Sequence, residues 1–370
     1  DCSACRMSVI TMNRERLVSV DAFRGATVAA MILVNNPGDW SHIYAPLEHA
    51  AWNGWTPTDL IFPFFLFLVG ASLSFSTRDT TRAAAIRALK IFGLGFFMAF
   101  YPRFNLFTVR IPGVLPRIAL CYFAAFLIKK HFGPRALAAI AAGCCLVYWF
   151  LLTVVPVPGG LPPNLEAATN LGAWLDRLVF GNHLWVSSKT WDPEGLLSSL
   201  PAIGTTLFGY LAGSLFRMGL GPSDILRRLA ISGSVMTLAG LAWDTVFPIN
   251  KSLWTSSYVL FTAGLASLIL AGFYWIADVK GYRSGLKPFV IYGVNAIVVF
   301  VASGLLAKTM GLIKLPLDGK IVSSQVYVYR TLFESWLAPI DASLAYAVAN
   351  VVLWYAVLWW MDRRAIYIKV

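Results

Sequence analysis

The chain has 370 residues, of which 58% are hydrophobic and only 13% are charged. A soluble globular domain is about half apolar and about a quarter charged, so this composition excludes an ordinary soluble protein. The net charge of +12 would suggest nucleic-acid binding in a soluble chain. In a membrane protein, basic residues set the topology and contact lipid headgroups, so we expect membrane lipids and no nucleic acid as partners.

Apolar segments long enough to cross a bilayer recur along the whole chain. A helix rises about 1.5 Å per residue, so about 20 apolar residues cross the hydrocarbon layer. Ten spans are predicted, near residues 17–36, 59–76, 84–101, 114–128, 136–155, 195–216, 229–247, 254–277, 288–307 and 341–361. We therefore predict an all-α polytopic membrane protein with a single transmembrane domain over 1–370, in which residues 1–15 are disordered or vector-derived.

The basic residues predict the orientation of these spans. Six segments expected on one side of the membrane each contain at least three Lys or Arg, which together make 20 of the 30 in the chain. Because basic residues favour the cytoplasmic side, both termini are predicted to be cytoplasmic. The long segments 37–58, 156–194 and 308–340 then lie outside, where such loops usually build a site or a lid. Residues 165–180 are predicted to form an interfacial helix.

The densest polar and aromatic segment joins the first two spans and contains His49, Trp52 and Asp59. Histidine suits proton transfer near neutral pH. His49 is therefore a candidate general base, although simple solvent exposure is the usual state of a histidine in a loop. Asp59 also fits the first turn of the next helix, where the helix dipole favours a carboxylate.

Other charged and amide residues admit two interpretations each. Asp21 and Arg24 share a helix face and form either a neutralised ion pair or a side of an anion-binding cavity. Asp192 and Glu194 form either an ordinary helix N-terminus or a site for a cationic amine. Asn295, inside a predicted span, either bonds a neighbouring helix or lines a pathway.

Basic residues also cluster near residue 110. Arg103, Arg110 and Arg117 flank the sequence Ile111-Pro112-Gly113-Val114-Leu115-Pro116, which suggests a basic pocket for lipid headgroups or phosphates. The sequence contains no Walker loop, nucleophile elbow, H-E-x-x-H motif or dinucleotide fingerprint, so ATP-driven transport, serine hydrolysis, zincin chemistry and Rossmann binding are unsupported. No metal site is predicted.

Several multi-residue blocks occur in a fixed order and carry a resemblance to a known family. The blocks are Asp21-Ala22-Phe23-Arg24-Gly25, Val34-Asn35, His49-Ala50-Ala51-Trp52-Asn53-Gly54, Asp59-Leu60-Ile61-Phe62-Pro63-Phe64-Phe65-Leu66-Phe67, Arg110-Ile111-Pro112-Gly113-Val114-Leu115, Asp192-Pro193-Glu194-Gly195 and Lys251-Ser252-Leu253-Trp254-Thr255. Over roughly residues 16–362 the chain resembles heparan-α-glucosaminide N-acetyltransferase and its bacterial homologues. The resemblance implies a transmembrane enzyme that passes acetyl from cytosolic acetyl-CoA to the amino group of a glucosamine-type sugar on the far side.

The resemblance implies two catalytic residues, and the positions of other polar residues suggest substrate contacts. His49 and Asn35 match the family's catalytic positions. We expect the acceptor sugar to contact Trp52, Asn53, Asp59, Asp192 and Glu194. We expect acetyl-CoA to contact Asp21, Arg24, Arg110, Arg117, Lys251 and Asn295. His49 either acts as a general base in direct transfer, which we favour, or carries the acetyl group itself.

The resemblance leaves other questions open. We expect a bacterial inner-membrane protein, because the chain begins just before the region that resembles the catalytic core. A homodimer is compatible with the sequence. The alternative functions are a secondary transporter of aminosugars and an O-acyltransferase that acts on a glycan hydroxyl.

Overall fold

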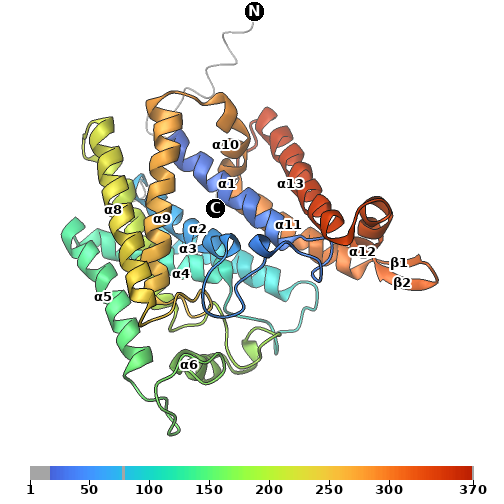
Figure 1. Ribbon diagram of the computed structural model, residues 1–370, viewed down its shortest axis with the longest axis horizontal. Helices are drawn as coiled ribbons and strands as arrows, with labels where there is room; N and C mark the ends of the chain where they lie inside the picture. Colours follow the sequence, from blue (N-terminus) through green and yellow to red (C-terminus); the bar gives the residue numbers. More distant parts are fainter. Residues whose placement is uncertain (1–16, 77–79, 369–370) are drawn as a thin grey trace, which may run out of the picture.

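A computed structural model of the chain describes residues 17–76 and 80–368, which form a helical bundle (Figure 1). Its elements in chain order are α1 (Val18–Asn35), α2 (Ile61–Ser74), α3 (Thr81–Phe100), α4 (Val114–His131), α5 (Pro134–Thr153), α6 (Leu171–Phe180), α7 (Ser199–Ser214), α8 (Pro222–Asp244), α9 (Ser256–Tyr274), α10 (Lys287–Val294), α11 (Ala296–Leu312), β1 (Lys314–Leu317), β2 (Lys320–Ser323), α12 (Ser324–Tyr329) and α13 (Pro339–Arg363). Short helical turns lie at Ala45–Leu47, Pro57–Leu60, Gly181–His183, Leu215–Arg217, Trp275–Val279, Ser284–Leu286 and Arg330–Glu334. Residues 1–15 lie outside the described part.

The helices confirm the prediction of an all-α polytopic membrane protein. Within residues 17–76 and 80–368, eight helical segments are long and apolar enough to cross a membrane, and a bent pair makes a ninth. The remaining predicted span corresponds to α4, an 18-residue helix. It contains three basic residues, Arg117, Lys129 and Lys130, the last two in its final turn.

The predicted continuous span 288–307 is broken, because α10 and α11 meet at Asn295 with a bend of 68°. The Asn295 side chain is buried and bonds the end of the chain: Nδ2 donates to Ile366 O at 3.1 Å, and Oδ1 accepts from Ile368 N at 3.1 Å. A break inside a span leaves polar groups that must find partners within the protein. The C-terminal segment supplies the partners of the Asn295 side chain.

A two-stranded antiparallel hairpin of β1 and β2 follows α11, where no strand was predicted. Asp318 and Gly319 join the strands and both have positive φ, of 49° and 73°. An Asp-Gly pair between two short strands is a strong hairpin signal, because it tolerates this left-handed backbone. The Asp318-Gly319 pair therefore indicated a hairpin, which the prediction of helices alone overlooked.

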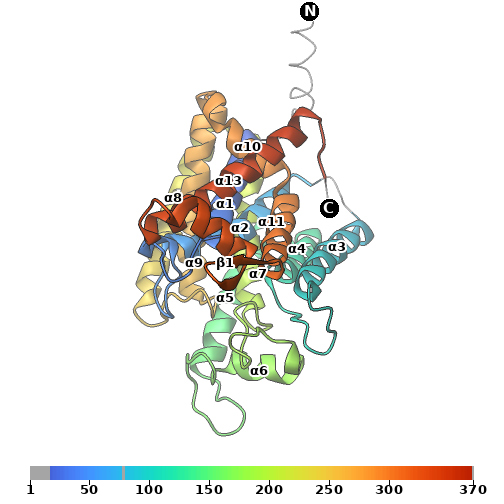
Figure 2. The same ribbon diagram turned by 90° about the vertical axis from the view of Figure 1, so that its right-hand side faces the viewer.

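The segments 37–58 and 156–194 meet at the end of the bundle that carries α6, which we call the loop end (Figure 2). Trp52 Nε1 in the first donates to Leu165 O in the second at 3.1 Å. The predicted interfacial helix 165–180 is shorter than expected, because Asn170 caps α6 by accepting from Ala173 N at 2.9 Å. Two separate loops thereby form one structured layer over the bundle.

Glycines let two pairs of helices approach until their backbones touch. A Cβ added at Gly70 of α2 would lie 1.8 Å from Thr206 O of α7, and one at Gly209 of α7 would lie 1.9 Å from Phe67 O. The pair α1 and α10 is similar, because a Cβ at Gly25 would lie 1.7 Å from Phe289 O. In a bilayer, such close packing of small residues is a main source of helix association.

We expect Gly209→Ala to destabilise the protein by roughly 1–3 kcal/mol, because the new methyl group has to push α2 and α7 apart. Thermal unfolding of the detergent-solubilised protein measures this effect. The control is Gly143→Ala in α5, where no atom lies within 4 Å of an added Cβ. Equal unfolding temperatures for the two variants would contradict the close packing of α2 and α7.

Candidate functional site

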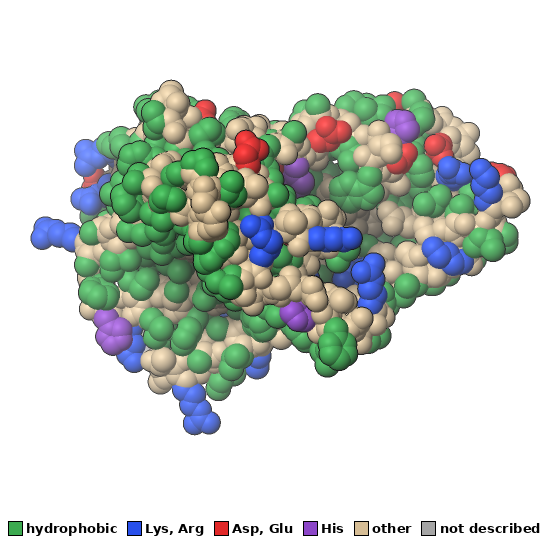
Figure 3. All heavy atoms as spheres, turned by 90° about the horizontal axis from the view of Figure 1, so that it is seen from below, with side chains coloured by type: hydrophobic (Ala, Val, Ile, Leu, Met, Phe, Trp, Pro, Cys, Tyr) green, Lys and Arg blue, Asp and Glu red, His purple; other side chains and the backbone are tan. Residues whose placement is uncertain are grey.

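A cavity of about 540 Å³ opens among the segments that meet the loop end. Its wall is made by Met31, Val34, Asn35, His49, Ala50, Ala51, Trp52, Thr58, Asp59, Ile61, Phe62, Phe65, Arg110, Val114, Leu115, Ile118, Trp185, Trp191, Pro193, Glu194, Lys251, Ser252, Ile297 and Phe300. Figure 3 shows the loop end, which is hollowed and has Lys and Arg side chains gathered beside the hollow. We call this space the reaction cavity.

The central polar contact joins His49 to Asp59. His49 Nδ1 lies 2.7 Å from Asp59 Oδ1, and the carboxylate is 2% exposed whereas the imidazole is 51% exposed. The other carboxylate oxygen accepts from Ala50 N at 3.0 Å and from Thr56 N at 3.1 Å. A carboxylate that receives several N–H donors is held in its ionised form. It can then only accept, so His49 Nδ1 carries the hydrogen and Nε2 is left as the basic nitrogen.

Lys251 completes this group from a distant part of the chain. Its Nζ lies 3.3 Å from Asp59 Oδ1, and 3.0 and 3.4 Å from His49 Nδ1 and Nε2. Both ring nitrogens flank the same carbon, so these distances place the ammonium beside the imidazole, within hydrogen-bond reach of either nitrogen. Burial lowers the pKa of Lys251, and the negative charges of Asp59 and Glu194 partly offset this effect.

The local sequence explains why the loop holds His49 in place. Thr56 and Asp59 form a reciprocal capping box at the start of the turn that leads into α2. Farther along the loop, Asn53 Oδ1 accepts from Asn250 Nδ2 at 3.1 Å, and Gly54 N donates to Ile249 O at 2.7 Å. These two bonds dock the loop onto the segment that carries Lys251.

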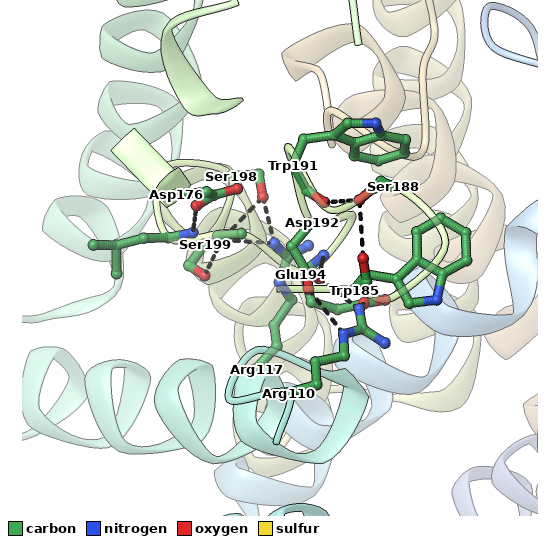
Figure 4. Close-up of polar contacts among 12 residues, drawn as sticks. Arg110, Arg117, Asp176, Trp185, Ser188, Trp191, Asp192, Glu194, Ser198 and Ser199 are labelled. Atoms are coloured by element: carbon green, nitrogen blue, oxygen red, sulfur yellow. Dashed lines mark hydrogen bonds and ion pairs between the residues drawn. The ribbon is translucent and has the colours of Figure 1, made fainter. Parts of the chain in front are cut away.

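Arg110 sits in the wall with two carboxylates behind it (Figure 4). Its Nε donates to Asp192 Oδ2 at 2.8 Å, and its terminal nitrogen bonds both Asp192 and Glu194. Burial would lower the pKa of Arg110, but these carboxylates outweigh it and raise the pKa. The guanidinium is thus a neutralised part of the wall rather than a lone cation.

Aromatic rings form another part of the wall. Trp52 and Trp191 are in edge-to-face contact with ring centroids 5.3 Å apart, and Trp185 contacts Trp191 at 5.9 Å. Flat indole surfaces beside polar groups are typical of sites that bind carbohydrate-sized ligands, which offer both apolar faces and hydroxyl groups. The sequence interpretation included Trp52 but assigned no role to Trp185 or Trp191.

Six of the residues predicted for the site lie outside the cavity lining. Arg117 is buried and donates to Gly195 O at 2.9 Å and to Ser198 (Figure 4). Arg24 pairs with Asp21 at 2.9 Å and donates to Ser72 Oγ at 2.6 Å between helices. Asp192 lies behind Arg110. Asn53 and Asn295 bond other segments, as described above.

Seven predicted residues do share the cavity: Asn35, His49, Trp52, Asp59, Arg110, Glu194 and Lys251. The residues that the sequence analysis missed are mostly apolar or aromatic, such as Phe65, Trp185 and Phe300. Phe65 and Phe300 are indistinguishable in the sequence from the other residues of apolar spans. Among the described residues, no group of three or more His, Cys, Asp and Glu is arranged to hold a metal ion.

Comparison with known proteins identifies the family of the chain. The sequence model of the heparan-alpha-glucosaminide N-acetyltransferase catalytic family matches residues 16–239. The chain belongs to this family. The heparan-alpha-glucosaminide N-acetyltransferase of Homo sapiens is 29% identical over 77% of the chain, and that of Mus musculus is 27% identical over 93%. The chain spans about half of the human protein and three-fifths of the mouse protein, at 52% and 60%.

The matched region runs from α1 into α8 and includes Asn35, His49, Asp59 and Glu194. Lys251 and Phe300 lie beyond it, although they line the same cavity. The family identification and the multi-pass membrane architecture are therefore established independently of the roles of individual residues, which remain predictions.

The loop that presents Glu194 and Trp191 is anchored by a buried carboxylate, which leads to a prediction about pH. Asp176 Oδ1 accepts from Leu196 N at 2.8 Å, and burial, reinforced by the charge of Asp192, raises the pKa of Asp176 from 3.8 to about 6. Between these values the folded protein holds a proton that the unfolded chain has released. Raising the pH through this window therefore destabilises the fold.

We expect Asp176→Asn to remove this pH-dependent loss of folding stability, because the amide keeps an acceptor for Leu196 N and carries no charge. The unfolding temperature of the variant relative to wild type should rise between pH ~4 and pH ~7. Thermal unfolding in detergent at the two pH values measures the difference. A difference that is the same at both values would show that Asp176 does not titrate in this range.

Proposed function

We propose that the chain is a transmembrane N-acetyltransferase that moves acetyl from cytosolic acetyl-CoA to the amino group of a glucosamine-type sugar on the periplasmic side of a bacterial inner membrane. Membership of the family supports the reaction class. The observation that carries the proposal is the His49–Asp59 pair, which leaves a basic imidazole nitrogen facing a cavity between helices.

The proposed reaction is direct transfer. His49 Nε2 removes a proton from the acceptor amine as the amine nitrogen attacks the thioester carbon. The bond from carbon to sulfur breaks, and the departing CoA thiolate takes up the proton from the imidazolium. Asp59 stabilises that imidazolium through the Nδ1 hydrogen bond, in the manner of a histidine-orienting carboxylate.

Asn35 is proposed to stabilise the negative charge that develops on the thioester oxygen. It is the last residue of α1, its side chain is exposed to the cavity, and it bonds no other described side chain. An amide N–H aimed at the developing oxyanion is a recurrent device in acyl transfer. The neighbouring Asn36 differs, because its Nδ2 donates to Ile32 O at 2.8 Å.

The two ends of the cavity suit the two substrates. Phe65, Ile118 and Phe300 give it an apolar part within the bundle, which fits the slender arm of the donor. Trp52, Trp191 and Glu194 lie toward the loop end, where the indoles can stack on a sugar and the carboxylate can attract an ammonium group. Arg24 remains the predicted contact for the donor phosphates.

Transport of aminosugars is the less well supported alternative. Alternating-access transporters usually place broken helices in both halves of an internal repeat. Among the described residues, one bent pair of helices passes as a span, at Asn295, and it has no counterpart of the same kind. An O-acyltransferase would use the same catalytic group, so amine and hydroxyl acceptors have to be compared directly.

We expect His49→Ala to lower acetyl transfer to glucosamine by a factor of about 10²–10⁴, the usual contribution of general acid–base catalysis. The purified protein is reconstituted in vesicles with acetyl-CoA on one side and the amine on the other. The matched control is His42→Ala, because His42 lies in the same loop, pairs with Asp39 and does not line the reaction cavity. Full activity in the His49 variant would remove that residue from the mechanism.

We expect Asn35→Ala to lower kcat by a factor on the order of 10²–10³ with a smaller change in KM, because the lost hydrogen bond strengthens in the transition state. Steady-state kinetics of acetyl transfer measure both constants. Asn36→Ala serves as the control and should stay close to wild type. A rise in KM with kcat unchanged would instead assign Asn35 to ground-state binding.

A further inference from the structure

The amino group of Lys251 lies beside the nitrogen that takes the proton from the acceptor in the proposed reaction. Lys251 Nζ is 3.4 Å from His49 Nε2, and Lys251 belongs to the wall of the reaction cavity. A general base has to come within about 3 Å of the atom that loses the proton. The acceptor nitrogen and Lys251 Nζ therefore occupy neighbouring positions around the same base.

A tight turn between α8 and α9 holds the backbone of Lys251 at the cavity. Asn250 Oδ1 accepts from Leu253 N at 2.8 Å, and Lys251 O accepts from Trp254 N at 3.1 Å. Trp254 is buried, so the turn is anchored in the core of the protein. The side chain of Lys251 is 24% exposed, and its flexible methylene stem lets Nζ move within the cavity.

The surroundings of Lys251 favour a neutral amine more than water does. Burial lowers the pKa of Lys251, and the negative charges of Asp59 and Glu194 oppose this effect without cancelling it. A lysine amine that is desolvated in this way is a recurrent nucleophile in enzymes, because its lone pair becomes available near neutral pH. Lys251 thus has the chemical character of the amine that the enzyme acetylates.

Resting on the proposed function, we propose that Lys251 is a self-acetylation site, which reacts when acetyl-CoA is bound and no acceptor fills the reaction cavity. The ammonium first releases one proton to solvent. Nζ then attacks the thioester carbon, the bond from carbon to sulfur breaks, and His49 Nε2 takes a second proton from the attacking nitrogen. The departing CoA thiolate takes up that second proton, so the products are acetyl-lysine and free CoA.

Self-acetylation would inactivate the enzyme. An acetylated Lys251 carries no charge, so Asp59 loses the ammonium that lies 3.3 Å from it. The acetyl group also fills space beside His49 in the reaction cavity. An amide is not cleaved by the CoA thiol, so the modification persists. A bound acceptor sugar protects Lys251, because it occupies the cavity and consumes the donor.

The test incubates the purified full chain with isotope-labelled acetyl-CoA and no acceptor, and peptide mass spectrometry follows the label on each lysine. Lys189 is the reference for unassisted chemical acetylation, because it is exposed at the loop end and does not line the reaction cavity. We expect Lys251 to react faster than Lys189 by a factor of about 10²–10⁴, the usual contribution of a general base. His49→Ala should lower the rate at Lys251 to that at Lys189, and saturating glucosamine should suppress the label.

Lys251→Arg separates self-acetylation from other losses of activity. Its guanidinium keeps a cation beside Asp59 and stays charged, so it accepts no acetyl group. For each protein, transfer to glucosamine is measured with and without prior incubation with acetyl-CoA, and the two rates are compared as a ratio. The ratio of wild type should fall with the time course of the Lys251 label, whereas that of Lys251→Arg should stay at one.

The outcomes distinguish self-acetylation from the proposed function. Label on Lys251 without any transfer to glucosamine would support self-acetylation and show that the proposed acceptor is wrong. Transfer to glucosamine with no more label on Lys251 than on Lys189 would overturn self-acetylation and leave the proposed function intact. Label that persists in His49→Ala, or that glucosamine does not suppress, would also overturn it, because the reaction would then not use the catalytic site.

Absence of both the label and the transfer would contradict both proposals.

Discussion

The buried carboxylate of Asp59 is the interaction on which the reaction cavity depends. It accepts backbone hydrogen bonds from Ala50 and Thr56, orients His49 and pairs with Lys251. Tyr258 of α9 also bonds the Asp59 backbone carbonyl. A buried charge is tolerated only when it is paired and fully hydrogen-bonded, so these groups have to be present together. The same contacts that make the carboxylate stable therefore place the imidazole.

The fold was largely predictable because long apolar segments of the sequence identify the membrane-spanning helices. The first span, for example, was expected near 17–36 and is observed as Val18–Asn35. The incorrect predictions occurred at short polar signals. Asn295 breaks an apolar stretch that still satisfies the length of a span, and Asp318-Gly319 turns the chain within a stretch treated as a loop.

The site was predictable where its residues are close in sequence. His49 and Asp59 lie ten residues apart, and the Thr56–Asp59 capping box lies between them and α2, so their proximity follows from local structure. Lys251 was expected near the donor, yet it contacts an imidazole 202 residues away. Such a pairing depends on how α8 and α9 pack in the bundle, which periodicity and charge patterns do not specify.

The role predicted for a charged residue can change once its ion-pair partners in the fold are known. Arg110 and Arg117 appear in the sequence as two basic residues near one Pro-Gly segment, suitable for phosphates. In the fold, Arg110 is neutralised by Asp192 and Glu194, and Arg117 is turned into the protein toward Gly195. Asp192 and Glu194 lie more than 80 residues after Arg110 in the chain. Their pairing with Arg110 therefore cannot be inferred from the local sequence.

The glycine contacts between helices have a mechanical consequence. Where α2 meets α7 and α1 meets α10, backbone lies directly on backbone with no side chain between them, so neither helix of a pair has room to move closer to the other. The contact of α3 with α11 is softer, because Gly304 faces only the terminal methyl of Met98. Rearrangement of the helices is therefore easier at contacts of this second kind than at the glycine contacts.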